Sequence, residues 1–283
     1  MENKKKNLIL LFFGVLVVAA FLVWSALVSV WGQEDKITVN FLDVGQGDSI
    51  LIQSPKGEIL IDGGPDKSVL EQIGSIMPFF DKKIELAILT HPDNDHINGL
   101  VEIAKRYEIE TVLATNEAAD NAAYAEWQNI LKEKDISRLT PEPGYKINLG
   151  DGAFLEVLWP PTDYYSSNLN DTSIITLLDW NETEVLLTGD AEIEVLDKLA
   201  VENPGLDIEI LKQPHHGSKT GASESLIKSF KPEYSVISAG ANNRYGHPHK
   251  EVLDLLTKCG VKILGTYELG TIKAVINKDS YQI

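Results

Sequence analysis

The sequence predicts an α/β domain of four layers, preceded by one apolar segment. In this αββα sandwich, two β-sheets pack face to face and helices cover their outer sides. Three observations predict this organisation. Apolar strands follow one another in hairpin-like runs, strands elsewhere alternate with helices, and both patterns occur in each half of the chain. The apolar segment is an uncharged run from Leu8 to Trp31.

The N-terminal run is long enough to cross a bilayer, which takes ~20 apolar residues. A cleaved signal peptide is the alternative, but its apolar region is usually ~7–15 residues and small residues precede its cleavage site, where Trp31 stands here. Lys4, Lys5 and Lys6 come before the run, and positive charge stays on the cytoplasmic side. We therefore expect a cytoplasmic basic tip at residues 1–6, a transmembrane anchor at 7–32 and an extracytoplasmic domain at 36–283.

The part of the chain beyond the basic tip is strongly acidic. It carries 22 Lys and Arg against 41 Asp and Glu, a net charge of −19. Such a surface has no general attraction for nucleic acid and repels anionic lipid. The lone Cys259 excludes an intramolecular disulfide.

The first half of the domain begins with strands and continues with strands that alternate with helices. Strands are predicted at 37–44, 49–54, 59–64, 84–90 and 109–115, and helices at Ser68–Phe80, Ile97–Tyr107 and Asn121–Lys134. In the last of these helices, Ala125, Ile130 and Leu131 are the expected inner residues.

The second half repeats this arrangement. Strands are predicted at 153–160, 173–180, 183–190, 207–214, 234–238, 262–266 and 271–276, and helices at Ala191–Ala200, Ser223–Phe230 and Pro248–Lys258.

All six histidines lie in three short clusters, each of which follows a predicted apolar strand. Asp190 ends a fourth such strand, "TEVLLTGD". Functional groups tend to lie on loops that a rigid scaffold positions, so we expect these strand ends to meet at one sheet edge. The clusters are His91 with His96, His215 with His216, and His247 with His249.

The first cluster, "HPDNDH", has the composition of a metal site. Imidazole and carboxylate ligands together suit Zn²⁺ and Mn²⁺. Asp and Asn are also ordinary turn and helix-cap residues. His91 and His96 at the two ends, with His and Asp partners elsewhere in the chain, favour the metal site over an ordinary turn.

This HxDxDH segment, together with "LDVGQGDSILIQ", "ILIDGG" and "LLTGD", resembles the metallo-β-lactamase superfamily. The segments "LKQPHHGS" and "NRYGHPH" are similar to the β-lactamase-like domain of ComEC/Rec2 competence proteins. The resemblance covers residues 37–276 and has two departures. Asp93 stands where the superfamily usually has a second His, which favours Mn²⁺ or loosely held Zn²⁺. One apolar segment cannot form the multi-helix channel of those proteins, so we expect no DNA transport by this chain alone.

The resemblance implies two divalent metal ions, Zn or Mn, and a role for each matched residue. It places His91 and Asp93 on one ion and Asp95 and His96 on the other, with Asp190 bridging both. One or both of two later histidines complete the set, namely His215 and His247.

Several further residues have two interpretations. Asp62 either orients the first cluster or only forms the turn before Gly63, and His216 acts as a general acid or caps a loop. Asp48 lies near the site or belongs to an ordinary hairpin turn, and "NDTS" at 170–173 lines the pocket or makes a turn. Four cations flank the His clusters and form either a positive lip or scattered solvated charges: Lys212, Lys219, Arg244 and Lys250.

The resemblance favours a phosphodiesterase, most plausibly a nuclease acting outside the membrane, with Asp95 orienting the nucleophile and His216 protonating the leaving group. DNA or another phosphodiester would be its substrate, and no protein partner is indicated. Hydrolysis of another envelope ester, such as a phosphocholine ester or a lactone, is the alternative that the acidic charge favours. A third interpretation is a non-catalytic tethered partner in DNA uptake.

Overall fold

The computed structural model describes residues 6, 12–21, 23–24 and 36–283. Most of the predicted anchor at 7–32 therefore lies outside the described residues. Within the described part, residues 12–21 are helical, and no helix there is long and apolar enough to cross a membrane.

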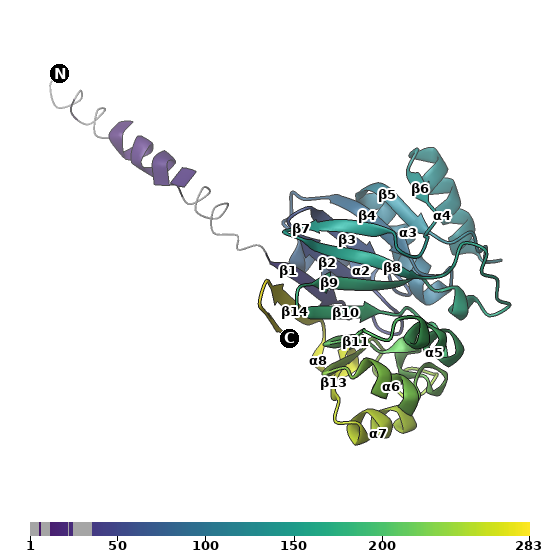
Figure 1. Ribbon diagram of the computed structural model, residues 1–283. Helices are drawn as coiled ribbons and strands as arrows, with labels where there is room; N and C mark the ends of the chain where they lie inside the picture. The colour runs from purple at the N-terminus through teal and green to yellow at the C-terminus, as the bar shows by residue number, and fades with distance from the viewer. Residues whose placement is uncertain (1–5, 7–11, 22, 25–35) are drawn as a thin grey trace.

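Two β-sheets form the centre of the domain (Figure 1). The first has eight strands in the order β15-β14-β1-β2-β3-β4-β5-β6, and the second has seven in the order β13-β12-β11-β10-β9-β8-β7. The strands of the first sheet are β1 Ile37–Phe41, β2 Ile50–Ser54, β3 Gly57–Ile61, β4 Lys83–Leu89, β5 Glu108–Ala114, β6 Ser137–Leu139, β14 Ile272–Asn277 and β15 Ser280–Gln282. Those of the second are β7 Lys146–Gly150, β8 Ala153–Trp159, β9 Ile175–Trp180, β10 Thr183–Leu187, β11 Ile210–Lys212, β12 Tyr234–Ile237 and β13 Lys262–Gly265.

Helices cover the outer face of each sheet (Figure 1). The helices are α2 Ser68–Ile76, α3 Asn94–Arg106, α4 Ala122–Glu133, α5 Ile193–Glu202, α6 Glu224–Phe230, α7 Lys250–Lys258 and α8 Thr266–Leu269, with 3₁₀ turns η1 Leu169–Thr172, η2 Pro214–Gly217 and η3 Lys219–Gly221. Helices α2 to α4 pack on the first sheet, and α5 to α7 on the second. The predicted αββα sandwich is thus confirmed for the domain.

The hydrophobic core between the sheets follows from the alternation of side chains along each strand. In β4, Ile88 belongs to the core between the sheets, whereas its neighbours Ala87 and Leu89 pack under the helices of the first sheet. The second half of β4 is therefore buried on both faces, which explains its apolar run at residues 86–89.

Three details of the predicted helices are wrong, and each has a physical reason. Helix α2 ends at Ile76 because the next turn contains Pro78, which disfavours helix at the residue before it. Helix α3 begins at Asn94, three residues before the predicted start, because the Ile97 amide already donates to the Asp93 carbonyl. In α4 the exposed Ala125 does not reach the core, whereas the fully buried Trp127 does.

Candidate metal centre

The histidine and aspartate clusters meet where strands of both sheets end. His91 follows β4, the pair Asp95 and His96 lies in the first turn of α3, and Asp190 follows β10. Strands β10, β11 and β12 are parallel, so η2, which carries His216, follows β11 at the same edge of the sheet as Asp190. The strand ends converge as expected, but they come from both sheets and not from one sheet edge.

Asp190 lies at the centre of the cluster. Its Oδ2 atom is 3.4 Å from Nε2 of His96 and 3.2 Å from Nε2 of His216. Nε2 of His216 is also 3.5 Å from Oδ2 of Asp95. Ligand atoms of Asp95, His96 and His216 all lie within 4.8 Å of one another, which is a spacing that one metal ion could bridge.

A second group adjoins the first through the same aspartate. His91, His96 and Asp190 also offer ligand atoms within 4.8 Å of one another. On the outer side of this group, Nε2 of His91 is 3.6 Å from Oδ2 of Asp93. Asp190 therefore lies between two potential ligand groups.

Three imidazole nitrogens of the cluster fit a metal ion because nothing among the described residues satisfies them. Nε2 of His91, His96 and His216 is buried and makes no well-formed hydrogen bond, although each faces a carboxylate oxygen at 3.2–3.6 Å. A buried polar atom left unpaired costs ~1–3 kcal/mol, so an imidazole nitrogen in this position is suited to ligate a cation.

The other ring nitrogen of each histidine is already held. Nδ1 of His96 donates to Asp62 at 2.8 Å, and Nδ1 of His216 donates to the Ser238 carbonyl at 2.9 Å. Nδ1 of His91 contacts the Thr90 hydroxyl at 3.0 Å. Metal-binding histidines are oriented in this way by partners of their second nitrogen, so the donor set fits divalent metal.

Protons take the place of cations when the cluster is free of metal. Burial lowers the pKa of His96, but the Asp190 and Asp62 carboxylates outweigh it and hold the pKa well above its usual value. For His216, Asp190 and Asp48 outweigh burial in the same way. The pKa of Asp190 falls well below its usual value, because His216 and His96 overcome the effect of burial.

Asp62 lies beneath the cluster and satisfies both of its proposed interpretations. Its carboxylate is buried and accepts hydrogen bonds from the Thr90 amide at 2.9 Å and from His96. It also has a left-handed backbone with φ of 57° before the Gly63 turn. Helix α3 packs closely on this turn, since a Cβ at Gly99 would lie 1.7 Å from the Gly63 carbonyl oxygen.

The three later histidines have different positions. His216 is buried inside the cluster, next to Asp190. This position suits neither a residue that only caps a loop nor a general acid that reaches the solvent. His215 lies at the rim, with Nε2 3.9 Å from Asp190 Oδ2 and Nδ1 3.5 Å from Glu192. His247 lies farther out, with its ring centroid 6.3 Å from that of His216. Burial lowers the pKa of His247 to about 4.

The backbone of the 215–216 segment is strained. His215 and His216 have φ of 48° and 55°, in the left-handed region that non-glycine residues rarely adopt. Such strain costs of order 1–3 kcal/mol per residue and gathers at functional sites. Here it turns two adjacent imidazoles toward Asp190.

Asp48 and Lys212 form a buried ion pair next to the cluster. The Lys212 ammonium contacts Asp48, lies 3.6 Å from Asp190 Oδ1 and donates to the Gly189 carbonyl at 2.9 Å. Lys212 is fully buried, so both expectations for it, a positive lip and a solvated charge, are wrong. Lys219 and Arg244 are exposed. The only sequence signal was a lysine inside an apolar strand before the His215–His216 pair.

Residues 42–241 match the metallo-beta-lactamase superfamily. The chain belongs to this superfamily. Its curated relatives include ComE operon protein 3 of Bacillus subtilis, 29% identical over 83% of this chain and 32% of the relative. Recombination protein 2 of Haemophilus influenzae is 27% identical over 100% of this chain and 34% of its own, and competence protein ComA of Neisseria gonorrhoeae is 25% identical. The chain thus spans about a third of the length of these relatives.

Solved structures of the superfamily share this fold. YhfI from Bacillus subtilis superposes with a TM-score of 0.57 at 12% identity, over 84% of this chain and 99% of its own. Zn²⁺-bound PqqB from Methylobacterium extorquens gives 0.53 at 14% identity, over 81% and 87%. The superfamily fold binds divalent metals and generally serves metal-dependent hydrolysis, which agrees with the candidate ligand groups found here.

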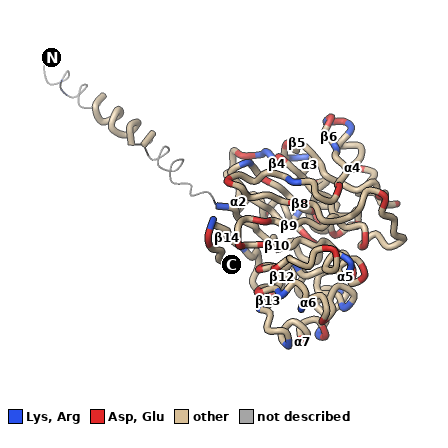
Figure 2. The backbone as a smooth tube through the Cα atoms, in the orientation of Figure 1, with Lys and Arg blue, Asp and Glu red and all other residues tan. Residues whose placement is uncertain are grey.

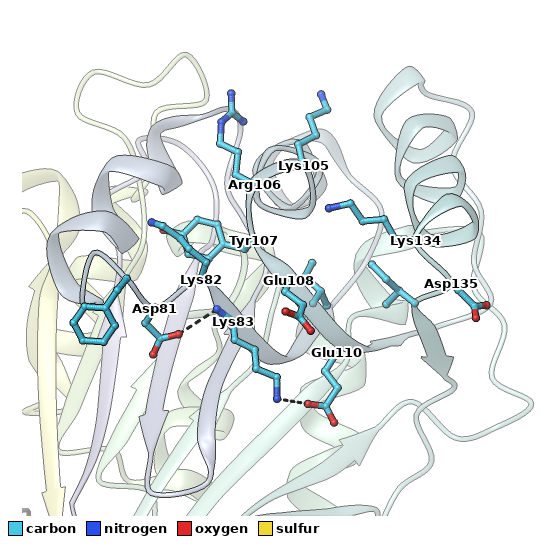
Figure 3. A pocket seen from close by; sticks show the side chains of 13 residues that line it. Asp81, Lys82, Lys83, Lys105, Arg106, Tyr107, Glu108, Glu110, Lys134 and Asp135 are labelled. Carbon is cyan, nitrogen blue, oxygen red and sulfur yellow. Dashed lines mark hydrogen bonds and ion pairs between the residues drawn. The ribbon is translucent and has the colours of Figure 1, made fainter. Parts of the chain in front are cut away.

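The metallo-beta-lactamase domain also has a pocket of about 920 Å³ that lies away from the histidine and aspartate cluster (Figure 3). It lies where β4 and β5 begin, near Lys83 and Glu108, whereas His91 follows the other end of β4. Lys83 is paired there with Glu85 and Glu110, so its charge is already neutralised. The pocket offers mixed surface charge and no histidine, and we assign it no chemistry.

Proposed function

We propose that the chain is a membrane-anchored, extracytoplasmic hydrolase that uses two divalent ions, Zn or Mn, to cut phosphodiester bonds, and that it is a nuclease. The observation that carries this proposal is the convergence of three unpaired buried imidazole nitrogens on carboxylates that lie between two ligand groups. The competence and recombination proteins among the relatives support DNA as the substrate class.

The ligands divide into two groups around Asp190. In our proposal His91 and Asp93 hold one ion, and Asp95, His96 and His216 hold the other, with Asp190 between them. Bound divalent ions supply Lewis-acid polarisation of the phosphoryl oxygen and make water acidic enough to attack at neutral pH.

The protein's own groups then handle protons at the two sides of the scissile bond. Asp95 is part-exposed at the edge of the cluster, where a pocket opens beside it, and would orient the attacking water. His216, our earlier candidate for the leaving-group proton, is buried in the cluster, whereas His215 is at the rim. We assign proton donation to His215, whose Nδ1 lies 3.5 Å from Glu192. Burial lowers the pKa of this imidazole, and the carboxylates of Asp190 and Glu192 act against that shift.

The test uses the purified full chain, stripped of metal and reloaded with Mn²⁺ or Zn²⁺. We expect metal-dependent cutting of DNA, loss of bound metal and of cutting in Asp190→Ala, and loss of cutting in Asp95→Ala. Asp254→Ala, which changes an exposed aspartate of α7, is the matched control and keeps both properties. An Asp190→Ala protein that holds two ions and cuts DNA contradicts the proposal.

The remaining outcomes separate the competing substrates. A chain that holds two ions but cuts no DNA points to another envelope ester, and phosphocholine esters and lactones are then the next substrates. The anchor is tested separately, since protease added outside intact cells removes residues 36–283 only if the domain is extracytoplasmic.

A further inference from the structure

A groove of about 580 Å³ opens directly beside the metal ligands. Asp93 and Asp95 form part of its wall, so a ligand in the groove reaches the cluster. Its volume is within the range of about 300–1,000 Å³ that is usual for small-ligand sites. The remaining wall residues are Gln46, Pro65, Asn94, Asn98, Asn243, Arg244 and Tyr245.

An aromatic platform forms one side of this groove. The Tyr245 ring is 49% exposed and is backed by His247, with ring centroids 5.7 Å apart and planes 23° from parallel. The exposed guanidinium of Arg244 lies over the Tyr245 ring, 4.8 Å from its centroid, and donates to the Tyr245 hydroxyl at 2.6 Å, so a base that stacks on this ring takes the place of the guanidinium. An exposed aromatic face beside a cation is the usual combination for an unpaired base and its phosphate.

The platform is held in place before any ligand binds. The Asn243 side chain accepts from the Tyr245 and His247 amides at 3.1 and 3.0 Å and donates to the Gly240 carbonyl at 2.9 Å. Gly240 in turn donates to the Gln46 side chain at 3.2 Å, which ties this loop to the one that follows β1. Little ordering is therefore needed on binding.

Amide groups on the opposite wall remain available to a ligand. Asn98 uses its Nδ2 for the Pro65 carbonyl and keeps its oxygen, and Gln46 keeps its Nε2 donors. Asn94 is exposed in the first turn of α3. Free amide donors and acceptors suit the edge of a base.

The charge of the domain limits the length of the ligand. Acidic residues are spread over the whole domain (Figure 2), and Arg244 is the only cation among the described residues that line the groove. A long duplex polyanion is therefore repelled, and its bases offer no free face to Tyr245.

We propose that the groove binds one unpaired nucleotide, with its base stacked on Tyr245 and its phosphate between Arg244 and the metal ligands. This deepens the proposed nuclease function and rests on it. The substrate is then single-stranded nucleic acid or a frayed strand end.

The test measures binding of the full chain to three labelled probes: a thymidine 12-mer, an abasic 12-mer and a 12-base-pair duplex. Fluorescence anisotropy is recorded with Ca²⁺ as the divalent ion, and gels verify that the probes are uncut. We expect Tyr245→Leu to weaken binding of the thymidine 12-mer by about 5- to 150-fold, down to the level of the abasic probe, and to leave the abasic probe unchanged. Tyr245→Phe retains the affinity, and Tyr145→Leu, at a similarly exposed tyrosine directly before β7, is the matched control.

Arg244→Gln has a different expected signature. It weakens both single-stranded probes equally and reduces the salt dependence of binding by about one charge. Equal losses for both 12-mers in Tyr245→Leu, or no loss, overturn the stacking assignment. Because binding is measured without cleavage, a chain that binds as expected but never cuts DNA refutes the nuclease function and keeps the nucleotide site.

Discussion

Replacing Lys212 with Met tests the buried ion pair beside the cluster. Methionine keeps the length of the side chain and removes its charge, which leaves Asp48, itself 2% exposed, without its ammonium partner. Breaking a buried pair by removing one partner costs about 3–5 kcal/mol. In a domain of this size that loss lowers the melting temperature by about 6–20 °C.

The loss depends on pH through Asp48. In the native protein burial raises the pKa of Asp48, but Lys212 and His216 outweigh it and the net shift is downward. Its contribution to stability is therefore present above the unfolded pKa of about 3.9 and is lost as pH falls through the folded value. In Lys212→Met burial raises the folded pKa above the unfolded one, so stability falls as pH rises through the folded value. The difference in unfolding free energy between the native protein and Lys212→Met thus widens above about pH 4.

Urea unfolding of the metal-free full chain at several pH values measures this difference. Adding Asp48→Asn to Lys212→Met removes the unpaired charge and should recover part of the stability. Lys250→Met, at an exposed pair with Asp254 on α7, changes unfolding by no more than about 0.5 kcal/mol. A Lys212→Met protein as stable as this control at neutral pH refutes the reasoning.

Three further predictions concern the cluster and the core. Asp62→Asn should weaken metal binding by about 10- to 100-fold, measured by competition with a chelating dye, because His96 loses its orienting carboxylate; unchanged affinity contradicts this. Loading the metal-free chain with metal at neutral pH should release protons, because the pKa values of His96 and His216 are raised without metal. Titration calorimetry in two buffers of different ionisation enthalpy detects this proton release, and the affinity for metal should rise with pH. Trp127→Ala should lower the free energy of unfolding by about 3–5 kcal/mol, measured in urea, because this fully buried ring leaves a cavity in α4; a loss below that of an exposed Ala125→Gly change argues against it.

The sequence was sufficient for the layers because its apolar periodicity differs between elements. The second half of β4, residues 86–89, is apolar without interruption because both of its faces are covered, whereas burial alternates along β8. In α4 periodicity placed Ile130 and Leu131 correctly on the buried face, but Ala125 is exposed and the fully buried Trp127 takes the inner position instead. The helix start at Asn94 depended on one backbone hydrogen bond that no residue pattern shows.

For the site, local motifs revealed the ligands near in sequence but not the choice among distant ones. HxDxDH indicated the cluster, yet the preference for His216 over His215 depends on two left-handed residues, which the sequence did not reveal. The Asp48–Lys212 pair joins the loop after β1 to the end of β11, more than 160 residues away, so only the fold brings it together. Tyr245 gave no signal, because an exposed aromatic matters only when its loop lies beside the cluster.

The buried lysine also explains how an acidic site can accept an anionic substrate. Five carboxylates surround the cluster, and Lys212 is the ammonium that contacts two of them. In the two-ion proposal, two divalent cations and this ammonium balance the five negative charges, so a phosphate meets a neutral centre and the guanidinium of Arg244. With one ion the carboxylates keep two uncompensated negative charges, apart from any proton that His96 or His216 takes up, and the phosphate is attracted less strongly. The number of bound ions should therefore control substrate binding as well as chemistry, and affinity for the single-stranded probe should rise mainly with the second ion. The five residues concerned are Asp48, Asp62, Asp93, Asp95 and Asp190.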